Sequence, residues 1–405
     1  MDRSELVART RSVDANTAAD IDLVAIAGDD GLLFQRDGVG FAARGCALQV
    51  ARRDIGDVLA AIAIDDEVRR PGSGPVAFGA LPFLPDQPAT LMIPEVVVGR
   101  GEDGSCWITD VGSGPFPEHP TLPSAPMRAT RSPSSFEVRS ARPPGEWCDA
   151  VSTATQRIRR GDLDKVVLAR ELVLVADQPI PTADVLVRLR QQYPGCFVFS
   201  IDGLVGATPE LLVSRHDDIV RAQPMAGTAP RRGDPQADAA VAAALLASPV
   251  YRHEHEVTID MVHDTLLAFC SYLDDEAEPS VVALANVQHL ATTVEGRLSH
   301  PPASVLELVA ALHPTPAVCG RPRAAALALI AEVEGLVRGR YAGTVGWVDA
   351  AGNGQWAVSI RCAQIDGRFA HLYGGNGIVA ESEPTAELAE TRDKLQAMLM
   401  AIVRP

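Results

Sequence analysis

The chain contains only two lysines, and both lie in short motifs with other charged residues. Lys165 lies in "DKVVLAR" and Lys394 in "ETRDKL", so the other 34 of the 36 basic residues are arginines. On a solvated face the two residue types are nearly interchangeable, but a general base needs an amine that can lose its proton, which a guanidinium cannot do. Both lysines are therefore candidates for chemistry, although a genomic bias towards arginine with two lysines left by chance explains the same count.

A second charged group surrounds Lys394 in the predicted closing helix, residues 384–403. Glu387, Glu390 and Lys394 follow one another at i, i+3 and i+7, which places them along one stripe of one helix face. The stripe could hold a cation through its carboxylates. An ordinary solvated charge face has the same spacing.

The segment "YRHEHE", residues 251–256, alternates histidine and glutamate on a predicted helix. A zincin helix needs histidines at i and i+4, but the partner position of His253 is Val257, so the pattern does not favour catalytic zinc. Carboxylates with few histidine ligands suit Mg²⁺, which prefers oxygen donors. Glu254 is thus a candidate Mg²⁺ ligand, and a surface helix charge is the alternative.

A glycine-dense strand end, a small-residue turn and two charged residues in apolar segments could bind an anion or move a proton. "LYGGNGIV" (372–379) and "MAGTAPRR" (225–232) can expose backbone amides, although plain turns have the same composition. Arg361, in "SIRCA", is predicted within a strand, where a buried guanidinium needs a partner such as a carboxylate. Glu210, in "GATPELLV", begins an apolar run, and desolvation there would raise its pKa towards that of a general acid unless it faces water at a strand edge.

The composition sets the class of protein. The 405 residues are 47% hydrophobic, carry a net charge of −16, and contain no basic stretch interleaved with aromatics, so we expect no nucleic-acid partner. Seven scattered cysteines without zinc spacing indicate a reduced, cytoplasmic chain. The N-terminus lacks an apolar signal-peptide core, and no apolar run approaches a membrane span.

Strand and helix signals occur in clusters rather than in strict alternation, which favours an α+β fold with antiparallel sheets. Residues 1–20 are predicted to be a loose tail, 20–111 to form strands and hairpins, and 112–135 to form a Pro- and Ser-rich loop. One strand is predicted over 165–175, and a strand hairpin over 196–215 with its turn at Asp202-Gly203. The segment "HLATTVEGRL" is predicted to be one strand, and residues 341–378 are predicted to form a meander. Helices are predicted over 235–273 with a break near Ser248-Pro249, in "ASVLELVAAL", in "RAAALALIAEVEGL" and over 384–403.

The motifs together resemble the chorismate-utilising enzymes, which include isochorismate, salicylate, anthranilate and aminodeoxychorismate synthases. The matching segments occur in family order from about residue 150 to the C-terminus: "DKVVLAR", "GATPELLV", "MAGTAPRRGD", "ASPVYRHEHE", "HLATTVEG", "LHPTPAVCG", "AGTVGWVDAAGNGQWAVSIRCA", "LYGGNGIV" and "ETRDKL". The resemblance implies two large antiparallel β-sheets packed as a sandwich with helices outside, one cleft, and Mg²⁺. It also implies one domain over 21–405, with a less typical half at 21–140 and a motif-bearing catalytic half at 150–405.

The resemblance also assigns roles to individual residues. It implies that Lys165 takes a proton from the water that attacks C2 of chorismate and that Glu210 protonates the leaving C4 hydroxyl. Mg²⁺ would be held by Glu254 and Glu390, with Glu387 close by. The implied substrate-binding residues are Gly227, Thr228, His289, Ala317, Tyr341, Arg361, Gly375, Gly377 and Lys394.

Three positions separate the branches of this family. Aminodeoxychorismate synthases carry a motif similar to "PIKGT", in which the lysine is the nucleophile; this chain has Ala226 in place of that lysine. Anthranilate synthases usually carry glutamine in place of Lys165. Salicylate-forming members tend to carry a hydroxyl residue in place of Ala317. The chain therefore resembles the isochorismate synthase branch, with salicylate synthase next. Asn376 departs from the pattern, because a small residue is more usual there.

Three other functions have weaker support in the sequence. A metal-dependent hydrolase is supported only by "RHEHE", and a non-catalytic carboxylate-binding module would need neither Lys165 nor Glu210. Anthranilate formation would need ammonia or an amidotransferase partner. The resemblance favours a monomer with chorismate as its substrate and no obligatory protein partner.

Overall fold

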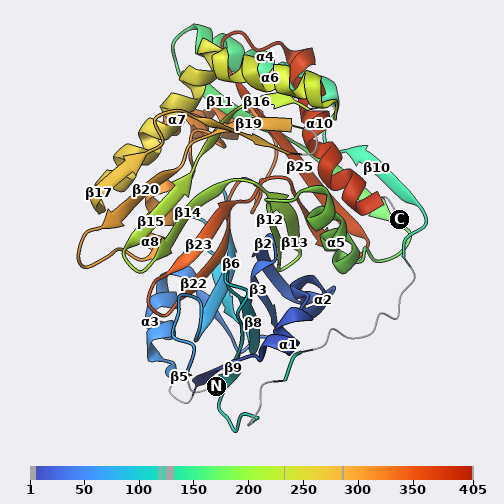
Figure 1. The fold of residues 1–405 in the computed structure, drawn as a ribbon. Coiled ribbons are helices and arrows are strands. Elements are labelled where there is room, and N and C mark those ends of the chain that lie inside the picture. The colour runs from blue at the N-terminus through green and yellow to red at the C-terminus, as the bar shows by residue number, and fades with distance from the viewer. Residues whose placement is uncertain (1–5, 118–120, 124–131, 232, 285–286, 404–405) are drawn as a thin grey trace.

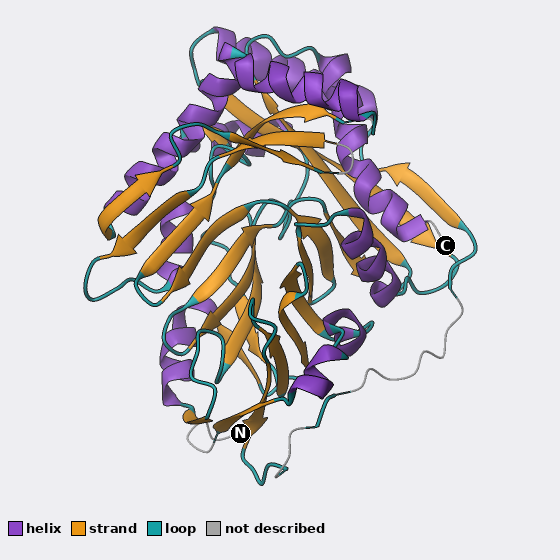
Figure 2. Cartoon of the chain, in the orientation of Figure 1, coloured by secondary structure: helices purple, strands orange, loops and turns teal. Residues whose placement is uncertain are grey.

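The computed structural model describes residues 6–117, 121–123, 132–231, 233–284 and 287–403. Two large sheets stand side by side, with most helices on the outside of the strands and a group of helices at one end (Figures 1 and 2). This arrangement confirms the predicted α+β fold with two large antiparallel sheets. The structure adds a third, small sheet that the sequence did not predict.

The largest sheet has 13 strands and runs in the order β10-β11-β25-β24-β13-β12-β2-β3-β8-β9-β1-β5, with β21 paired to β11. Its strands are β1 (Val7–Ser12), β2 (Leu32–Arg36), β3 (Val39–Arg44), β5 (Ala63–Asp66), β8 (Val96–Arg100), β9 (Cys106–Gly112), β10 (Phe136–Ser140), β11 (Lys165–Ala176), β12 (Phe197–Ile201), β13 (Leu204–Thr208), β21 (Gly320–Arg321), β24 (Cys362–Asp366) and β25 (Phe369–Ile378). Its described ladders are antiparallel except for the parallel pair of β1 and β5.

The second sheet has nine strands in the order β17-β20-β15-β14-β23-β22-β6-β7-β4, and the third has three in the order β16-β19-β18. The strands of the second sheet are β4 (Leu48–Ala51), β6 (Val76–Leu81), β7 (Thr90–Ile93), β14 (Leu211–His216), β15 (Ile219–Gln223), β17 (Cys270–Asp275), β20 (Val294–Leu298), β22 (Thr344–Asp349) and β23 (Gly354–Val358). Those of the third are β16 (Met225–Pro230), β18 (Ser280–Ala283) and β19 (Val287–Ala291).

The helices cover the sheets. They are α1 (Ala15–Ala19), α2 (Leu23–Ala27), the 3₁₀ turn η2 (Arg52–Asp54), α3 (Ile55–Ala61), α4 (Pro144–Arg159), α5 (Thr182–Gln192), α6 (Pro235–Ala247), α7 (Pro249–Leu267), α8 (Val305–Leu312), α9 (Arg323–Val333) and α10 (Pro384–Val403). Helices α6 and α7 pack on β16 and β19 of the small sheet, and α10 packs on β25. Every helix in the described part of the chain is too short or too polar to span a bilayer.

Successive side chains of a strand point to opposite faces of the sheet, which explains how one sheet contributes to two hydrophobic cores. In β2, Phe34 faces the core shared by the large sheets, and its neighbour Leu33 faces the core under the helices. In β3, Phe41 and Ala42 alternate in the same way. Strands with both faces buried become continuous apolar runs. The sequence therefore shows these strands clearly but does not show which face meets which layer.

The predicted loose tail is wrong for the described residues of 1–20. β1 lies between β5 and β9, Ala8 is fully buried, and the hydroxyls of Thr10 and Thr109 are 2.8 Å apart. Helix α1 follows, with Asp14 as its N-cap. The mixed charge that suggested a tail belongs to a strand whose alternate residues face solvent. The rest of the predicted domain division, one domain over 21–405, stays a prediction.

Three local predictions also need correction. The N-terminal region predicted as strands contains α2 and α3, because a five-residue apolar run such as "LVAIA" does not by itself distinguish a helix from a strand. Helix α7 ends at Leu267, and the next residues form β17. "HLATTVEGRL" is two strands, β19 and β20, that belong to different sheets. The described part of 113–135 is irregular, as predicted, and residues 118–120 and 124–131 lie outside the described residues.

Candidate active site

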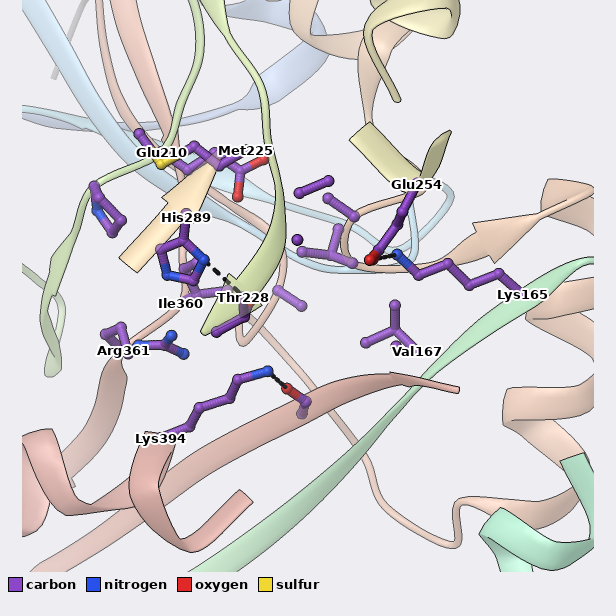
Figure 3. A pocket seen from close by; sticks show the side chains of 18 of the residues that line it. Lys165, Val167, Glu210, Met225, Thr228, Glu254, His289, Ile360, Arg361 and Lys394 are labelled. Carbon is purple, nitrogen blue, oxygen red and sulfur yellow. Dashed lines mark hydrogen bonds and ion pairs between the residues drawn. The ribbon is translucent and has the colours of Figure 1, made fainter. Parts of the chain in front are cut away.

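One pocket gathers residues from the largest and the smallest sheet, from two helices and from links between elements, some of which lead to or from strands of the second sheet. It is lined by both predicted catalytic residues, by Glu254, and by every predicted substrate-binding residue: Lys165, Glu210, Gly227, Thr228, Glu254, His289, Ala317, Tyr341, Arg361, Gly375, Gly377 and Lys394. Figure 3 shows the Lys165–Glu254 pair at one side of this pocket and Glu210 with Met225 at another. Glu387 and Glu390 are not among the lining residues.

Lys165 begins β11 and is largely buried, with 12% of its side chain exposed. Its Nζ atom donates to Oε1 of Glu254 on α7 at 2.5 Å. Gly377 faces it on the paired strand β25, and a Cβ atom there would lie 2.5 Å from Cε of Lys165. The glycine therefore leaves room for the lysine side chain to lie across the strand into the pocket.

Glu210 lies in the link between β13 and β14 and is only 3% exposed. Burial raises the pKa of its carboxyl group to about 8, although the amide of Met225 and the charges of Lys165 and Arg361 act in the opposite direction. Glu210 is therefore mostly protonated at neutral pH. A buried, protonated carboxyl group that faces a pocket can deliver a proton to a leaving group.

His289 on β19 lies against Thr228 on β16, with 3.1 Å between Nδ1 and the Thr228 hydroxyl. Burial, together with the charges of Arg361 and Lys394, lowers the pKa of His289 to about 3, so the imidazole is neutral. Its Nε2 atom is buried without a hydrogen-bond partner among the described residues. A buried, unpaired ring nitrogen in a pocket is a ready contact for a polar group of a ligand.

Arg361 is a buried cation whose counter-charge is missing from the described part of the chain. It is 8% exposed, its Nε atom lacks a hydrogen-bond partner, and none of the described ion pairs includes it. Burial lowers its pKa, which shows that the charge is held at a cost. The prediction that Arg361 lies within a strand is wrong: it lies in the link between β23 and β24 with φ at +50°, and this turn aims the side chain into the pocket.

Tyr341 and Gly375 complete the region around Arg361. The Tyr341 ring stacks on Tyr373 with centroids 5.0 Å apart, and burial raises the pKa of its phenol, so the hydroxyl keeps its proton as a donor. A Cβ atom at Gly375 would lie 2.9 Å from this hydroxyl, so only glycine leaves the space open. A donor and an uncompensated guanidinium in one buried region suit a carboxylate.

Of the predicted metal ligands only Glu254 lines the pocket, and the three carboxylates do not form a closed group. Glu254 pairs with Lys165, and Glu390 pairs with Lys394 at 2.7 Å. Glu387 accepts from Asn376 at 2.8 Å and from Ser382 at 2.7 Å, and burial raises its pKa. Within the described ranges, no three acidic, histidine or cysteine side chains are placed to hold a metal ion.

The donor chemistry of these carboxylates nevertheless fits a divalent cation. Burial raises the pKa of Tyr251, and the charges of Glu390, Glu254 and Glu387 act in the same direction. Oxygen donors of this kind suit Mg²⁺. Lys394 is buried with its Nζ atom 3.0 Å from the carbonyl oxygen of Gly375, so its charge balances that of Glu390 from the side of the pocket.

Six lining residues were not singled out from the sequence: Val167, Pro209, Met225, Val318, Ala342 and Ile360. A seventh, Ala226, was noted there only as a position that separates branches of the family. The strand period of two could have found Val167, which is two residues from Lys165 on the same strand. The Lys165–Glu254 pair joins residues 89 positions apart and has no local signal.

Comparisons with known proteins agree with this geometry. The family model described as "Chorismate binding enzyme" matches residues 119–403. The chain belongs to the chorismate-binding enzyme family.

Members of this family with similar sequences include isochorismate synthase DhbC of Bacillus subtilis, which is 38% identical over 342 residues covering 82% of this chain and 81% of the relative. Isochorismate synthase EntC of Escherichia coli is 36% identical over 330 residues, with 80% of each chain covered. The solved structure of the menaquinone-specific isochorismate synthase MenF of Escherichia coli matches with a TM-score of 0.84 over 98% of this chain and 95% of that chain, at 23% identity. This last likeness shows the shared fold.

Proposed function

We propose that this protein is an isochorismate synthase, which isomerises chorismate to isochorismate. One observation carries the proposal: the same pocket holds an amine that can act as a base, that of Lys165, and a carboxyl group that keeps its proton, that of Glu210. An isomerisation that adds water at one carbon and expels hydroxide from another needs one group in each of these states. The isochorismate synthases among the relatives support the same activity.

In the proposed reaction, water attacks C2 of the ring while Lys165 accepts its proton. The new C2–O bond forms, the ring double bonds shift, and the C4–O bond breaks. Glu210 gives its proton to the departing oxygen, so a water enters, a water leaves, and no redox change occurs. Arg361 and Tyr341 bind the enolpyruvyl carboxylate, and His289 with Thr228 lies against the ring.

We propose Mg²⁺ as the cofactor, with Glu254 and Glu390 as the residues that would hold it and Glu387 beside them. When bound, the ion would supply positive charge for the ring carboxylate of the substrate. The monomeric state and the cytoplasmic location remain predictions of the sequence.

The direct test is to incubate the purified protein with chorismate and Mg²⁺ near neutral pH and to separate the products by chromatography. Isochorismate that converts back to chorismate is the expected product. Salicylate with pyruvate would instead show that the enzyme also carries out the elimination step. Chorismate that binds without turnover would contradict the proposal.

Removal of the metal is expected to abolish isochorismate formation. EDTA should stop the reaction, and added Mg²⁺ should restore it. Glu390→Gln and Glu254→Gln are each expected to weaken Mg²⁺ binding by at least about tenfold, measured by titration calorimetry on the protein without substrate. Glu383→Gln, at an exposed position near the start of α10, is the matched control and should bind as the wild type does. Unchanged binding in both site variants would contradict the assignment.

Ala317 is expected to keep the reaction from proceeding to salicylate. It lies in the pocket wall, and its methyl group offers no hydroxyl for proton transfer or for a hydrogen bond to the enolpyruvyl group. We expect Ala317→Thr to release measurable pyruvate, detected with lactate dehydrogenase, while Ala317→Val releases none. Equal pyruvate from both variants would show that side-chain size, and not the hydroxyl, controls the product.

A further inference from the structure

A buried ion pair lies directly behind the pocket wall and contacts no pocket space itself. Glu334 is the C-cap of α9, and Gly335 turns the chain with φ at +59°. After this turn, the side chain of Arg338 lies beside that of Glu334. The side chains are 1% and 3% exposed. Arg338 donates through Nε to Oε1 of Glu334 at 2.7 Å and through Nη2 to Oε2 at 2.6 Å.

The remaining hydrogen bonds of this pair are made to the backbone of two pocket walls. Nη2 of Arg338 donates to the carbonyl oxygen of Val167 at 2.6 Å, and Nη1 donates to that of Val318 at 2.9 Å. Oε2 of Glu334 accepts from the amide of Ala169 at 2.8 Å. Val167 and Ala169 are on the strand that begins with the proposed base, and Val318 directly follows Ala317.

Arg338 also contacts a third wall and the N-terminal half of the chain. The amide of Tyr341 donates to the carbonyl oxygen of Arg338 at 2.9 Å. The guanidinium lies over the ring of Phe83, 4.2 Å from its centroid. The side-chain fork therefore joins the Lys165 strand to the Ala317 loop, and the main chain of Arg338 holds the Tyr341 turn beside them. These three segments carry residues assigned to different parts of the substrate.

Stability alone does not account for this pair. Burying two charges costs desolvation free energy, and well-packed apolar residues are often as stable or more stable at such positions. A planar guanidinium, in contrast, can hold several acceptors at fixed directions at once, which neither lysine nor an apolar side chain can do. Here the guanidinium bridges the carbonyl oxygens of Val167 and Val318, beside the direct bond from the Val167 amide to the Cys319 carbonyl oxygen and the short ladder of β11 with β21.

We propose that Glu334 and Arg338 are positioning residues of the active site, which hold the Lys165 strand and the Ala317 loop at the separation that the reaction needs. The inference rests on the proposed isochorismate synthase activity. It predicts that loosening the fork lowers the rate of the chemical step more than it weakens substrate binding, because a displacement of about 1 Å can cost about a hundredfold in rate.

The test compares Arg338→Lys with Arg340→Lys. Arg340 is two residues away and also donates to backbone carbonyls and to a carboxylate, Asp202, but it contacts the turn between β12 and β13 instead of the pocket. We expect Arg338→Lys to lower kcat about ten- to a hundredfold with KM within about threefold, and Arg340→Lys to change neither. Glu334→Gln keeps an acceptor for Ala169 and serves as the second variant if Arg338→Lys does not fold; it should show the same split.

Hydrogen exchange followed by mass spectrometry gives a readout that does not depend on the reaction. Peptides covering 165–170 and 316–320 should exchange faster in Arg338→Lys than in the wild type and in Arg340→Lys. Suppose that the wild type forms isochorismate and that Arg338→Lys exchanges faster but keeps the wild-type kcat. This result would overturn the inference and leave the proposed function intact. Unchanged exchange would overturn it whatever the wild type makes. A wild type that forms no isochorismate would refute the proposed function, and the exchange comparison would still decide whether the fork holds these walls.

Discussion

Lys165→Arg is expected to fold normally and to lose isochorismate formation by about a thousandfold or more, because a positioned base contributes about 10² to 10⁴ in rate and arginine cannot cycle a proton. The substitution keeps the positive charge beside Glu254, so a purely electrostatic role for Lys165 would survive it. Lys165→Met removes both charge and proton acceptor and should be equally inactive. Product formation at saturating chorismate and Mg²⁺ measures the effect.

The matched control for this variant is Arg321→Ala. Arg321 lies opposite Lys165 in the short ladder between β21 and β11, and about half of its side chain is exposed. The control disturbs the same strand end but not the pocket, so it should keep nearly full activity. The assignment of the base is wrong if Lys165→Arg keeps more than about a tenth of the wild-type kcat while the melting temperatures agree.

Glu210→Gln is expected to remove the proton that the C4 oxygen needs and to lower kcat by about 10² to 10⁴, with little change in chorismate binding. The pH profile tests the same assignment in the wild type. Because the pKa of Glu210 is raised to about 8, its acid form predominates below that pH, and the rate should fall as pH rises through about 8. Glu210→Gln should lose this descending limb of the profile.

The stability of Glu210→Gln separates a catalytic loss from a folding loss. The folded state binds the Glu210 proton more tightly than the unfolded state, so between about pH 4.5 and 8 the wild type loses stability as pH rises. Glutamine has no proton to lose, and the melting temperature of Glu210→Gln should therefore exceed that of the wild type by a margin that grows from pH 5 to pH 8. Glu137→Gln, at an exposed site on β10, should show no growing margin. A margin that stays constant would show that Glu210 is not held protonated by burial.

The sequence by itself was enough to identify the family and the candidate site residues. The types and order of residues in motifs such as "DKVVLAR" and "GATPELLV" were enough to identify the family, the two catalytic candidates and the pocket residues, because these are local properties of short segments. The strong strand and helix periodicities also placed β11, the hairpin of β12 and β13, the break between α6 and α7, and α10. Local patterns carry this information because period and turn chemistry act within a few residues.

Tertiary structure alone decided which of these local features act together. The tail-like residues 7–12 became an interior strand of the largest sheet, and "HLATTVEGRL" was divided between two sheets, since pairing partners lie far away in the chain. The same holds in the site: burial sets the protonation of Glu210 and His289, and a turn with positive φ directs Arg361 into the pocket. The Glu334–Arg338 fork has only an ordinary i, i+4 spacing in sequence. The positioning role proposed for the fork depends on its hydrogen bonds to the backbone groups of Val167, Ala169 and Val318. Only folding brings these groups within reach of its donors and acceptors.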